Sequence, residues 1–388
     1  MEPMVLAEMR RIVARVLLVG AILSLQAGGQ ESSNANPPVE LSWVKGKCLR
    51  CTSPWTLGST LFTSRSEAWA IGEAWPPPGG QGIGERVLLH TSDGGRGWRE
   101  VPRTQHYAMS PSVAFVDPMY GWIETYTVLG DSLLFETRNA GRGWKKIDGL
   151  FPAFPTVLDP LHWWGIESTS HAPSADGRFW TRTLVRTADG GHTWSKFAIP
   201  YDAGEFPTVK FRSADVGWAA NVAGGGIVVF RTTDGGKTWQ KSTTAAPNHP
   251  TSIRDLFFLD RDYGWLVADY NLKEGINGSG TLVFATIDGG KTWTRQMNDA
   301  FQSGFTWLIT FSSEHLGIAF VTAPPLSPGS GETALSNLAL AYTLDMGAHW
   351  RKVTVPDWVY GCQAFERDLL CSANGKGSRP RVLTIHAK

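Results

Sequence analysis

The sequence is poor in charge. Of its 388 residues, 18% are Asp, Glu, Lys or Arg, and the formal net charge is only +1. Proteins that bind nucleic acids or anionic surfaces electrostatically carry a basic excess or a basic patch. The composition therefore argues against a nucleic-acid partner.

Two further patterns are missing. The nine histidines show neither HxH nor HExxH spacing, which would bring neighbouring side chains to one metal ion. Beyond the N-terminal segment, no stretch has the long apolar period of a helix. We therefore expect an all-β protein without a metal site or cofactor.

One octet of residues recurs six times. The copies are TSDGGRGW from Thr91, TRNAGRGW from Thr137, TADGGHTW from Thr187, TTDGGKTW from Thr232, TIDGGKTW from Thr286 and TLDMGAHW from Thr343. Upstream of each octet lies an apolar stretch with a short polar turn and, in three of the six copies, Gly-Trp. Two signatures that keep one order at a spacing of about 50 residues indicate a repeat architecture.

Each repeat contains β-branched and aromatic runs bounded by Gly, Asp and Pro, a pattern that predicts four short strands. Four-stranded antiparallel sheets repeated around an axis form a β-propeller, which protects strand edges. Three more strands are expected after the last octet, and residues 40–46 (ELSWVKG) can supply a fourth. We predict a seven-bladed propeller over residues 40–388, a monomer closed by the N-terminal strand.

Most of the 18 tryptophans have a regular place in this pattern. Six close the octets, namely Trp98, Trp144, Trp194, Trp239, Trp293 and Trp350, and Trp43 is expected to take the same place in the last blade. Five more lie on second strands, namely Trp69, Trp122, Trp164, Trp218 and Trp265. These positions predict packing between blades.

The octet has a structural interpretation. Its third residue can accept hydrogen bonds from nearby backbone N–H groups and hold a turn, and the glycine two positions later tolerates positive φ. These third residues are Asp93, Asn139, Asp189, Asp234, Asp288 and Asp345. Because asparagine suits an acceptor and not a catalytic acid, we interpret the octet as a turn.

The octets resemble the Asp-box, or BNR, repeat. TTDGGKTW (232–239), TIDGGKTW (286–293), DVGWAAN (215–221) and DYGWLVA (262–268) are most similar to the photosystem II assembly/stability factor family. That resemblance implies a secreted or lumenal seven-bladed propeller that helps to assemble a membrane complex without catalysis. Sialidases and sortilin-type propellers are more distantly similar, and the sialidase tetrapeptide Phe/Tyr-Arg-Ile-Pro is absent.

The N-terminus is typical of an export signal. Arg10 and Arg11 precede the apolar run 16–25 and the small residues 27–29, and the run is short for a membrane span. We predict a signal peptide over 1–29, a flexible leader over 30–39, and a secreted or periplasmic protein. An uncleaved N-terminal anchor and translation from Met9 are the alternatives.

The four cysteines fit an oxidising compartment. Cys362 and Cys371 are expected on adjacent strands joined by a turn at 366–367, where a disulfide forms if the register places them opposite. Cys48 and Cys51 can form a second local disulfide. The alternative pairing joins the N-terminal segment to the last blade.

The face of the propeller opposite the octet turns offers candidate functional residues. Four acids near the ends of second strands, Glu73, Glu124, Glu167 and Asp269, could rim the channel and serve a glycoside hydrolase, which needs paired carboxylates. Six aromatic or histidine residues of the same side are candidates for binding a partner: Trp55, Trp75, His106, Tyr107, Trp180 and Trp358. We expect a non-catalytic propeller that binds a protein, or alternatively a carbohydrate, through these loops.

Overall fold

The computed structural model describes residues 39–49, 56–74, 85–101, 109–126, 132–147, 153–170, 180–199, 208–244, 246, 250–271, 279–296, 306–312, 316–322, 338–355, 357–375 and 379–388. Residues 39–388 form one compact unit. The predicted signal peptide and nearly all of the predicted leader lie outside the described residues. None of the described residues belongs to a helix long and apolar enough to cross a membrane.

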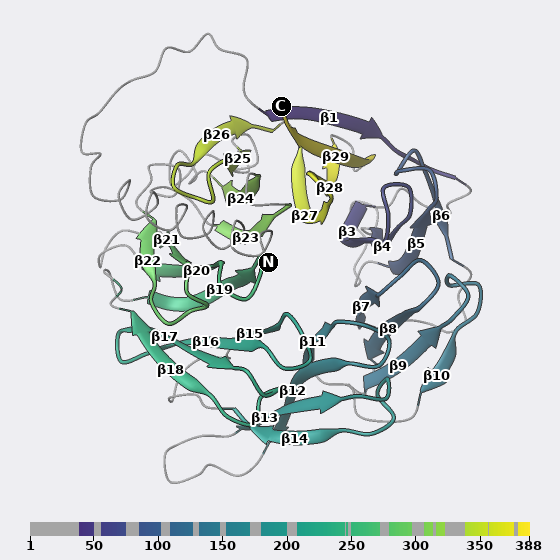
Figure 1. Ribbon diagram of the computed structural model, residues 1–388. Coiled ribbons are helices and arrows are strands. Elements are labelled where there is room, and N and C mark those ends of the chain that lie inside the picture. The colour runs from purple at the N-terminus through teal and green to yellow at the C-terminus, as the bar shows by residue number, and fades with distance from the viewer. Residues whose placement is uncertain are drawn as a thin grey trace, which may run out of the picture. The chain divides into compact units, whose positions relative to one another are not determined.

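The unit 39–388 is an all-β, seven-bladed propeller, as predicted, with seven sheets around a central axis (Figure 1). The innermost strands are β3 (Thr56–Phe62), β7 (Met109–Phe115), β11 (Ala153–Val157), β15 (Thr208–Phe211), β19 (Pro250–Phe258), β23 (Thr306–Phe311) and β27 (Trp358–Phe365). The second strands are β4 (Ala68–Ala74), β8 (Gly121–Tyr126), β12 (Trp163–Ser170), β16 (Gly217–Ala223), β20 (Gly264–Asn271), β24 (Gly317–Thr322) and β28 (Asp368–Gly375).

The outer half of each blade is built in the same way. The third strands are β5 (Glu85–Thr91), β9 (Ser132–Thr137), β13 (Trp180–Thr187), β17 (Gly226–Thr232), β21 (Ser279–Thr286), β25 (Leu338–Thr343) and β29 (Arg379–Ala387). The outermost strands are β6 (Gly97–Glu100), β10 (Lys145–Ile147), β14 (Ser195–Ala198), β18 (Gln240–Thr244), β22 (Thr294–Gln296), β26 (Arg351–Thr354) and, in the seventh blade, β1 (Val39–Lys45).

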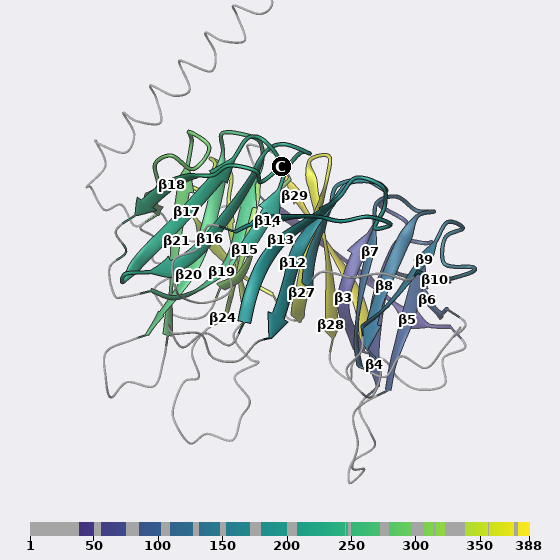
Figure 2. The ribbon, with the colours of Figure 1, turned by 90° about the horizontal axis from the view of Figure 1, so that it is seen from below.

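Antiparallel pairing in chain order gives the ring two distinct faces. The octets and the turns between first and second strands lie at one end of the blades, which we name the octet face. The connections between second and third strands, and those between blades, lie at the other end, which we name the loop face. Figure 2 shows the ring edge-on, with second strands such as β4 and β12 running from the octet face to the loop face.

The N-terminal strand closes the ring. All seven residues of β1 pair antiparallel with β29, from Val39 opposite Ala387 to Lys45 opposite Arg381. The chain then crosses to the first blade, where β2 (Lys47–Cys48) pairs parallel with β6. One short segment therefore belongs to two blades, because it completes the seventh sheet and adds a fifth strand to the first.

Side chains reinforce the seam between the seventh and first blades. The buried Asn374 amide accepts a hydrogen bond from the Leu57 N–H at 2.8 Å and donates one to the Leu57 carbonyl at 2.7 Å. At the octet face, Arg65 pairs with Asp368 at 2.6 Å. Backbone groups of an innermost strand are thus satisfied by the neighbouring blade, which a buried strand edge requires.

Trp43 does not take the place of an octet tryptophan, contrary to the sequence-based expectation. In the other blades, the residue after the tryptophan pairs with the residue before the octet threonine, as Gln240 does with Arg231. In the seventh blade, His386 holds the threonine position and pairs with Glu40. Trp43 pairs with Leu383, three residues farther along the strand, because no octet turn precedes β1.

Among the described residues, aromatic stacking joins four of the seven pairs of neighbouring blades. The second-strand tryptophan of one blade stacks on the phenylalanine that ends the inner strand of the following blade, as Trp218 does on Phe258 with ring centroids 3.5 Å apart. The octet tryptophan of that following blade, Trp293, meets the same phenylalanine edge-on at 6.0 Å. All five second-strand tryptophans are fully buried. The tryptophans therefore form the core between blades, as the sequence pattern predicted.

The third blade departs from the Gly-Trp signature for a steric reason. In the second, fourth, fifth and sixth blades a Cβ on the glycine would collide with the inner-strand phenylalanine, at 2.4 Å for Gly121 against Phe115. The third blade has Val157 in place of that phenylalanine, opposite Trp163. The smaller valine leaves room for Trp163, whose ring meets Trp122 of the preceding blade at 4.2 Å.

The predicted disulfide between Cys362 and Cys371 is present. The two residues lie directly opposite each other on β27 and β28, with Cα atoms 4.0 Å apart. This bond excludes the alternative pairing between the N-terminal segment and the last blade. Cys51 lies outside the described residues, so a bond from Cys48 to Cys51 stays a prediction.

The seam leads to a first prediction about stability. A Cβ at Gly46, between β1 and β2, would lie 2.5 Å from the Gly95 carbonyl oxygen and 2.9 Å from that of Pro380. Backbone cannot move aside cheaply, so we expect Gly46→Ala to lower the free energy of unfolding by about 1–3 kcal/mol. Urea denaturation measures this change.

The matched control is Gly361→Ala in β27. Nothing lies within 4 Å of a Cβ at that position, so the free energy of unfolding should change by no more than about 0.5 kcal/mol. Equal effects of the two substitutions would contradict the close approach at the seam.

Candidate functional site

The acid of each octet is engaged by its own turn. In the five aspartate-containing octets, the threonine hydroxyl donates to the aspartate Oδ1 at 2.7–2.8 Å. The same threonine oxygen accepts the backbone N–H of the residue four positions on, as Gly236 donates to Thr232 at 2.9 Å. The aspartate also accepts a backbone N–H, which for Asp234 comes from Thr238 at 2.9 Å. These bonds hold the turn that begins the outermost strand.

The second octet makes the same turn with asparagine. Asn139 Oδ1 accepts from the Thr137 hydroxyl at 3.0 Å and from the Gly143 N–H at 2.9 Å. An amide oxygen therefore does what the carboxylate does elsewhere, so the turn needs an acceptor and not an acid.

Hydrogen bonding also removes these carboxylates from acid–base chemistry near neutral pH. The Thr193 hydroxyl and backbone lower the pKa of Asp189 to about 2, and those of Thr238 do the same for Asp234. A general acid or base needs a pKa near the working pH. The octet aspartates are therefore structural groups.

The four second-strand acids do not share one position. Counted from the buried second-strand tryptophan of each blade, Glu124 lies two residues on, Glu167 three, and both Glu73 and Asp269 four. Side chains alternate between the two faces of a strand, so Glu167 points to the opposite side of its sheet from the others.

Two of these acids pair with a cation of their own blade. Asp269 is only 2% exposed and pairs with Arg254, a bulge residue of β19 whose side chain is 48% exposed. Glu167 pairs with Lys196 on the outermost strand β14 at 2.6 Å. Glu124 is buried in β8. Burial raises the pKa of Asp269 while Arg254 opposes the shift. The side chain of Glu73 lies outside the described residues.

The inner strands of four blades line a cavity of about 290 Å³ that sequence reasoning missed. Lys210, Asp255, Ile309 and Cys362 contribute to it from β15, β19, β23 and β27. Asp255 accepts the Ile309 N–H at 3.0 Å and so joins the fifth blade to the sixth. Burial raises its pKa, and the Lys210 charge opposes that shift. The only sequence signal was one acid beside an apolar run, Asp255-Leu-Phe-Phe.

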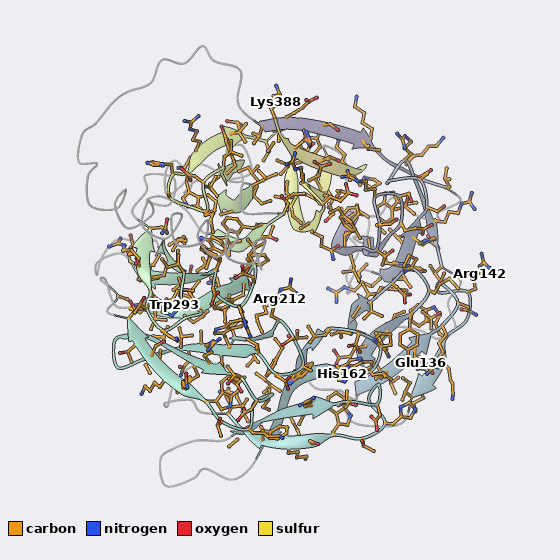
Figure 3. All side chains as sticks on the ribbon, viewed as in Figure 1. Glu136, Arg142, His162, Arg212, Trp293 and Lys388 are labelled. Carbon is orange, nitrogen blue, oxygen red and sulfur yellow. A yellow bond between two sulfur atoms is a disulfide. The ribbon has the colours of Figure 1, made fainter. Side chains whose placement is uncertain are left out.

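This cavity is poorly equipped for glycoside hydrolysis. Hydrolysis requires two carboxyl groups about 5–10 Å apart, and Asp255 is the single carboxylate among the described lining residues. The cations Lys210 and Arg212 line the same cavity, and Figure 3 shows Arg212 near the centre of the ring. The described residues also contain no group of three or more His, Cys, Asp or Glu side chains that could hold a metal ion.

Most candidates for the binding face cannot be placed. Trp55, Trp75, His106 and Tyr107 lie outside the described residues. Trp180 begins β13 and Trp358 begins β27, both at the loop-face end of their strands, but their side chains are not described. The backbone thus puts two of the six on the expected face.

Comparison with known proteins gives the repeat and the fold. Residues 230–241 match the model of the BNR/Asp-box repeat. No curated protein matches the chain. The match includes Thr232, Asp234 and Trp239, whose contacts are described above.

Three solved structures share the propeller architecture. "YCF48 bound to D1 peptide" is 16% identical with a TM-score of 0.55, over 91% of this chain and 98% of that chain. YCF48 from Cyanidioschyzon merolae is 16% identical with a TM-score of 0.53, over 89% and 98%. A prolyl endopeptidase is 9% identical with a TM-score of 0.54, over 86% of this chain and 50% of that chain. At such low identities, these TM-scores show a common fold and nothing more.

The octet geometry predicts a pH-dependent stability. The ordinary pKa of an aspartate is 3.8 and that of Asp234 is about 2, so the carboxylate stabilises the fold fully above about pH 4 and loses that effect as the pH falls towards 2. We expect Asp234→Asn to be less stable than wild type near neutral pH. The difference should shrink towards pH 2 in urea titrations.

A reciprocal variant provides the control. Asn139→Asp adds a carboxylate to a turn that has Gly143 where Asp234 has Thr238, so no hydroxyl donor stands there. Its gain in stability between pH 2 and pH 5 should be smaller than the loss at Asp234. A difference between wild type and Asp234→Asn that stays constant with pH would contradict the assignment.

Proposed function

We propose that this chain is an exported, non-catalytic propeller that recognises a segment of a partner protein through its loop face. The observation that carries the proposal is the state of its carboxylates. Octet aspartates hold turns, Asp269 and Glu167 are paired within their blades, and Asp255 bridges two blades. A rigid ring of this kind offers surface for binding and no described pair of free acids for hydrolysis.

Two further points support a protein partner. The structurally similar YCF48 has been solved with a bound peptide, which shows that a propeller of this size can accommodate one. The connections at the loop face differ in length and sequence between blades, and variable loops on a fixed scaffold are where binding residues concentrate. The resemblance of the octets to the photosystem II assembly/stability factor family, together with the proposed export, is the reason for proposing a partner in a membrane complex of the cell envelope.

The decisive experiment compares hydrolysis with binding. We expect the purified protein to hydrolyse no member of a glycoside panel, and Glu124→Gln and Glu167→Gln to be indistinguishable from wild type in that assay. Hydrolysis by wild type that either substitution abolishes would replace this proposal by the glycoside hydrolase alternative.

Binding should depend on the loop face. We expect a protein captured from envelope extract by wild type to be lost with Trp75→Ala and Trp358→Ala, by about tenfold or more if these are anchors. Lys237→Ala, an exposed octet-face residue of the fourth blade, is the matched control and should capture as wild type does. Capture that is unaffected by both tryptophan substitutions would refute the loop face as the binding surface.

A further inference from the structure

The octet face carries an apolar feature of its own. Met119 and Leu161 are the exposed large hydrophobic residues of the described chain, each 52% exposed. They occupy the same position in the turns between first and second strands of the second and third blades. Each carbonyl accepts a backbone hydrogen bond from the neighbouring octet, Met119 from Ala140 at 3.0 Å and Leu161 from Gly190 at 3.1 Å.

The other blades show what this position needs structurally. The carbonyls of Ser66, Asp215 and Asp262 accept the same hydrogen bond. The donors are the N–H groups of Gly94, Gly235 and Gly289, at 2.8–2.9 Å. Three blades thus place a small or charged polar side chain here, as the surface of a soluble protein favours. The turn does not require an apolar side chain, so packing does not explain Met119 or Leu161.

Both turns are rigid. Asp117 Oδ1 accepts the N–H groups of Met119 and Tyr120 at 2.7 Å each, and Asp159 Oδ1 accepts that of Leu161 at 2.8 Å. A proline follows each aspartate and fixes φ. The backbone of such turns therefore loses little conformational entropy when a partner binds, which favours the turns as places for anchors.

The two apolar residues belong to one continuous surface. Tyr120 is next to Met119, and its hydroxyl lies 3.9 Å from the Cβ position of Gly190, the residue that donates to Leu161. Arg138, with a side chain 65% exposed, lies over the Tyr120 ring at 5.1 Å. We name Met119, Tyr120, Arg138 and Leu161 the Met119–Leu161 surface. Figure 3 shows Glu136 and His162 on these two neighbouring blades, with Arg142 farther out on the rim.

The second blade places exposed cations on the octet face. Arg138 contacts the Tyr120 hydroxyl at 3.3 Å and Glu136 at 3.5 Å, and its side chain is still 65% exposed while that of Glu136 is only 10% exposed. Arg142 and Lys145 are exposed and have no ion-pair partner within the described part of the chain. Arg138 and Arg142 belong to the octet that has Asn139 where the other five have aspartate, so this octet carries no carboxylate. The nearby Asp117 and Asp159 each serve two backbone N–H groups. The chemistry next to the apolar anchors is therefore that of a receptor for carboxylates.

We propose that the Met119–Leu161 surface is a second docking site, which takes an acidic segment of a partner protein. The partner buries Met119 and Leu161 and places carboxylates against Arg138 and Arg142. Methionine, tyrosine and arginine are enriched at the centres of protein interfaces. A membrane-binding surface needs a broader apolar face than two side chains. This site lies opposite the loop face and is independent of the function proposed above.

The test selects ligands for the full chain from a phage-displayed library of random dodecapeptides. The variant is Met119→Asp combined with Leu161→Asp, which should fold because Asp215 and Asp262 hold the same position in other blades. We expect enriched peptides with acidic residues beside two apolar ones. Their affinity should fall about tenfold or more in the double variant, and fall also in Arg142→Glu.

The matched control is Asp215→Ser, which changes the same turn position in the fourth blade to the residue of the first. It should bind the selected peptides as wild type does, and so should the loop-face variant Trp75→Ala, which separates this site from the proposed loop-face function. Thermal unfolding of each variant should match that of wild type within a few degrees, about the shift expected for a surface change.

Several results would overturn the proposal. One is a selection whose peptides bind wild type and the double variant equally, or carry no acidic residues. Another is sedimentation with phosphatidylglycerol vesicles that the double variant abolishes, which would assign the surface to a membrane. A third is self-association of the purified chain that the double variant abolishes, which would assign it to a second copy.

Discussion

The pairing of β1 with β29 is the constraint on which the structure depends. Seven sheets can surround a central axis only if the last one meets the first, and here the chain makes that meeting with its own N-terminal strand. The crossing at Gly46 and the parallel pairing of β2 with β6 extend the closure into the first blade. Closure leaves each blade packed against two neighbours, which is why stacked pairs such as Trp218 and Phe258 recur around the ring.

A closed ring also limits where function can lie. Residues between blades pack against one another, and the octet acids hold turns. Asn139 holds its turn with an amide oxygen in place of a carboxylate. Buried acids such as Asp255 satisfy backbone N–H groups of a neighbouring blade. Functional contacts must therefore come from the ends of the blades. The two faces differ in what changes from blade to blade. On the loop face the length and sequence of the connections change, whereas on the octet face the turn is constant and single side chains change.

The repeats made the fold predictable from the sequence, since six octets and three remaining strands leave one strand to be supplied by residues 40–46. Details set by register were not predictable in the same way. Trp43 is displaced because β1 enters its sheet without an octet turn. The second-strand acids looked alike by their distance from the strand end, yet strand alternation separates Glu167 from the rest. The cavity beside Asp255 unites four blades that are far apart in the sequence. Met119 and Leu161 could have been found by comparing the turns of different blades in the sequence. Other blades have Ser66, Asp215 and Asp262 at the same position, and polar residues there indicate an exposed position.

Hydrogen exchange of the β1 backbone amides, followed by mass spectrometry, tests closure most directly. If β1 is an integral strand of the seventh blade, those of its amides that donate to β29 exchange as slowly as the amides of β28 and β29, through unfolding of the whole sheet. Rapid exchange of those same β1 amides while β28 and β29 stay protected would show that the ring does not depend on its N-terminal strand, and would contradict this account.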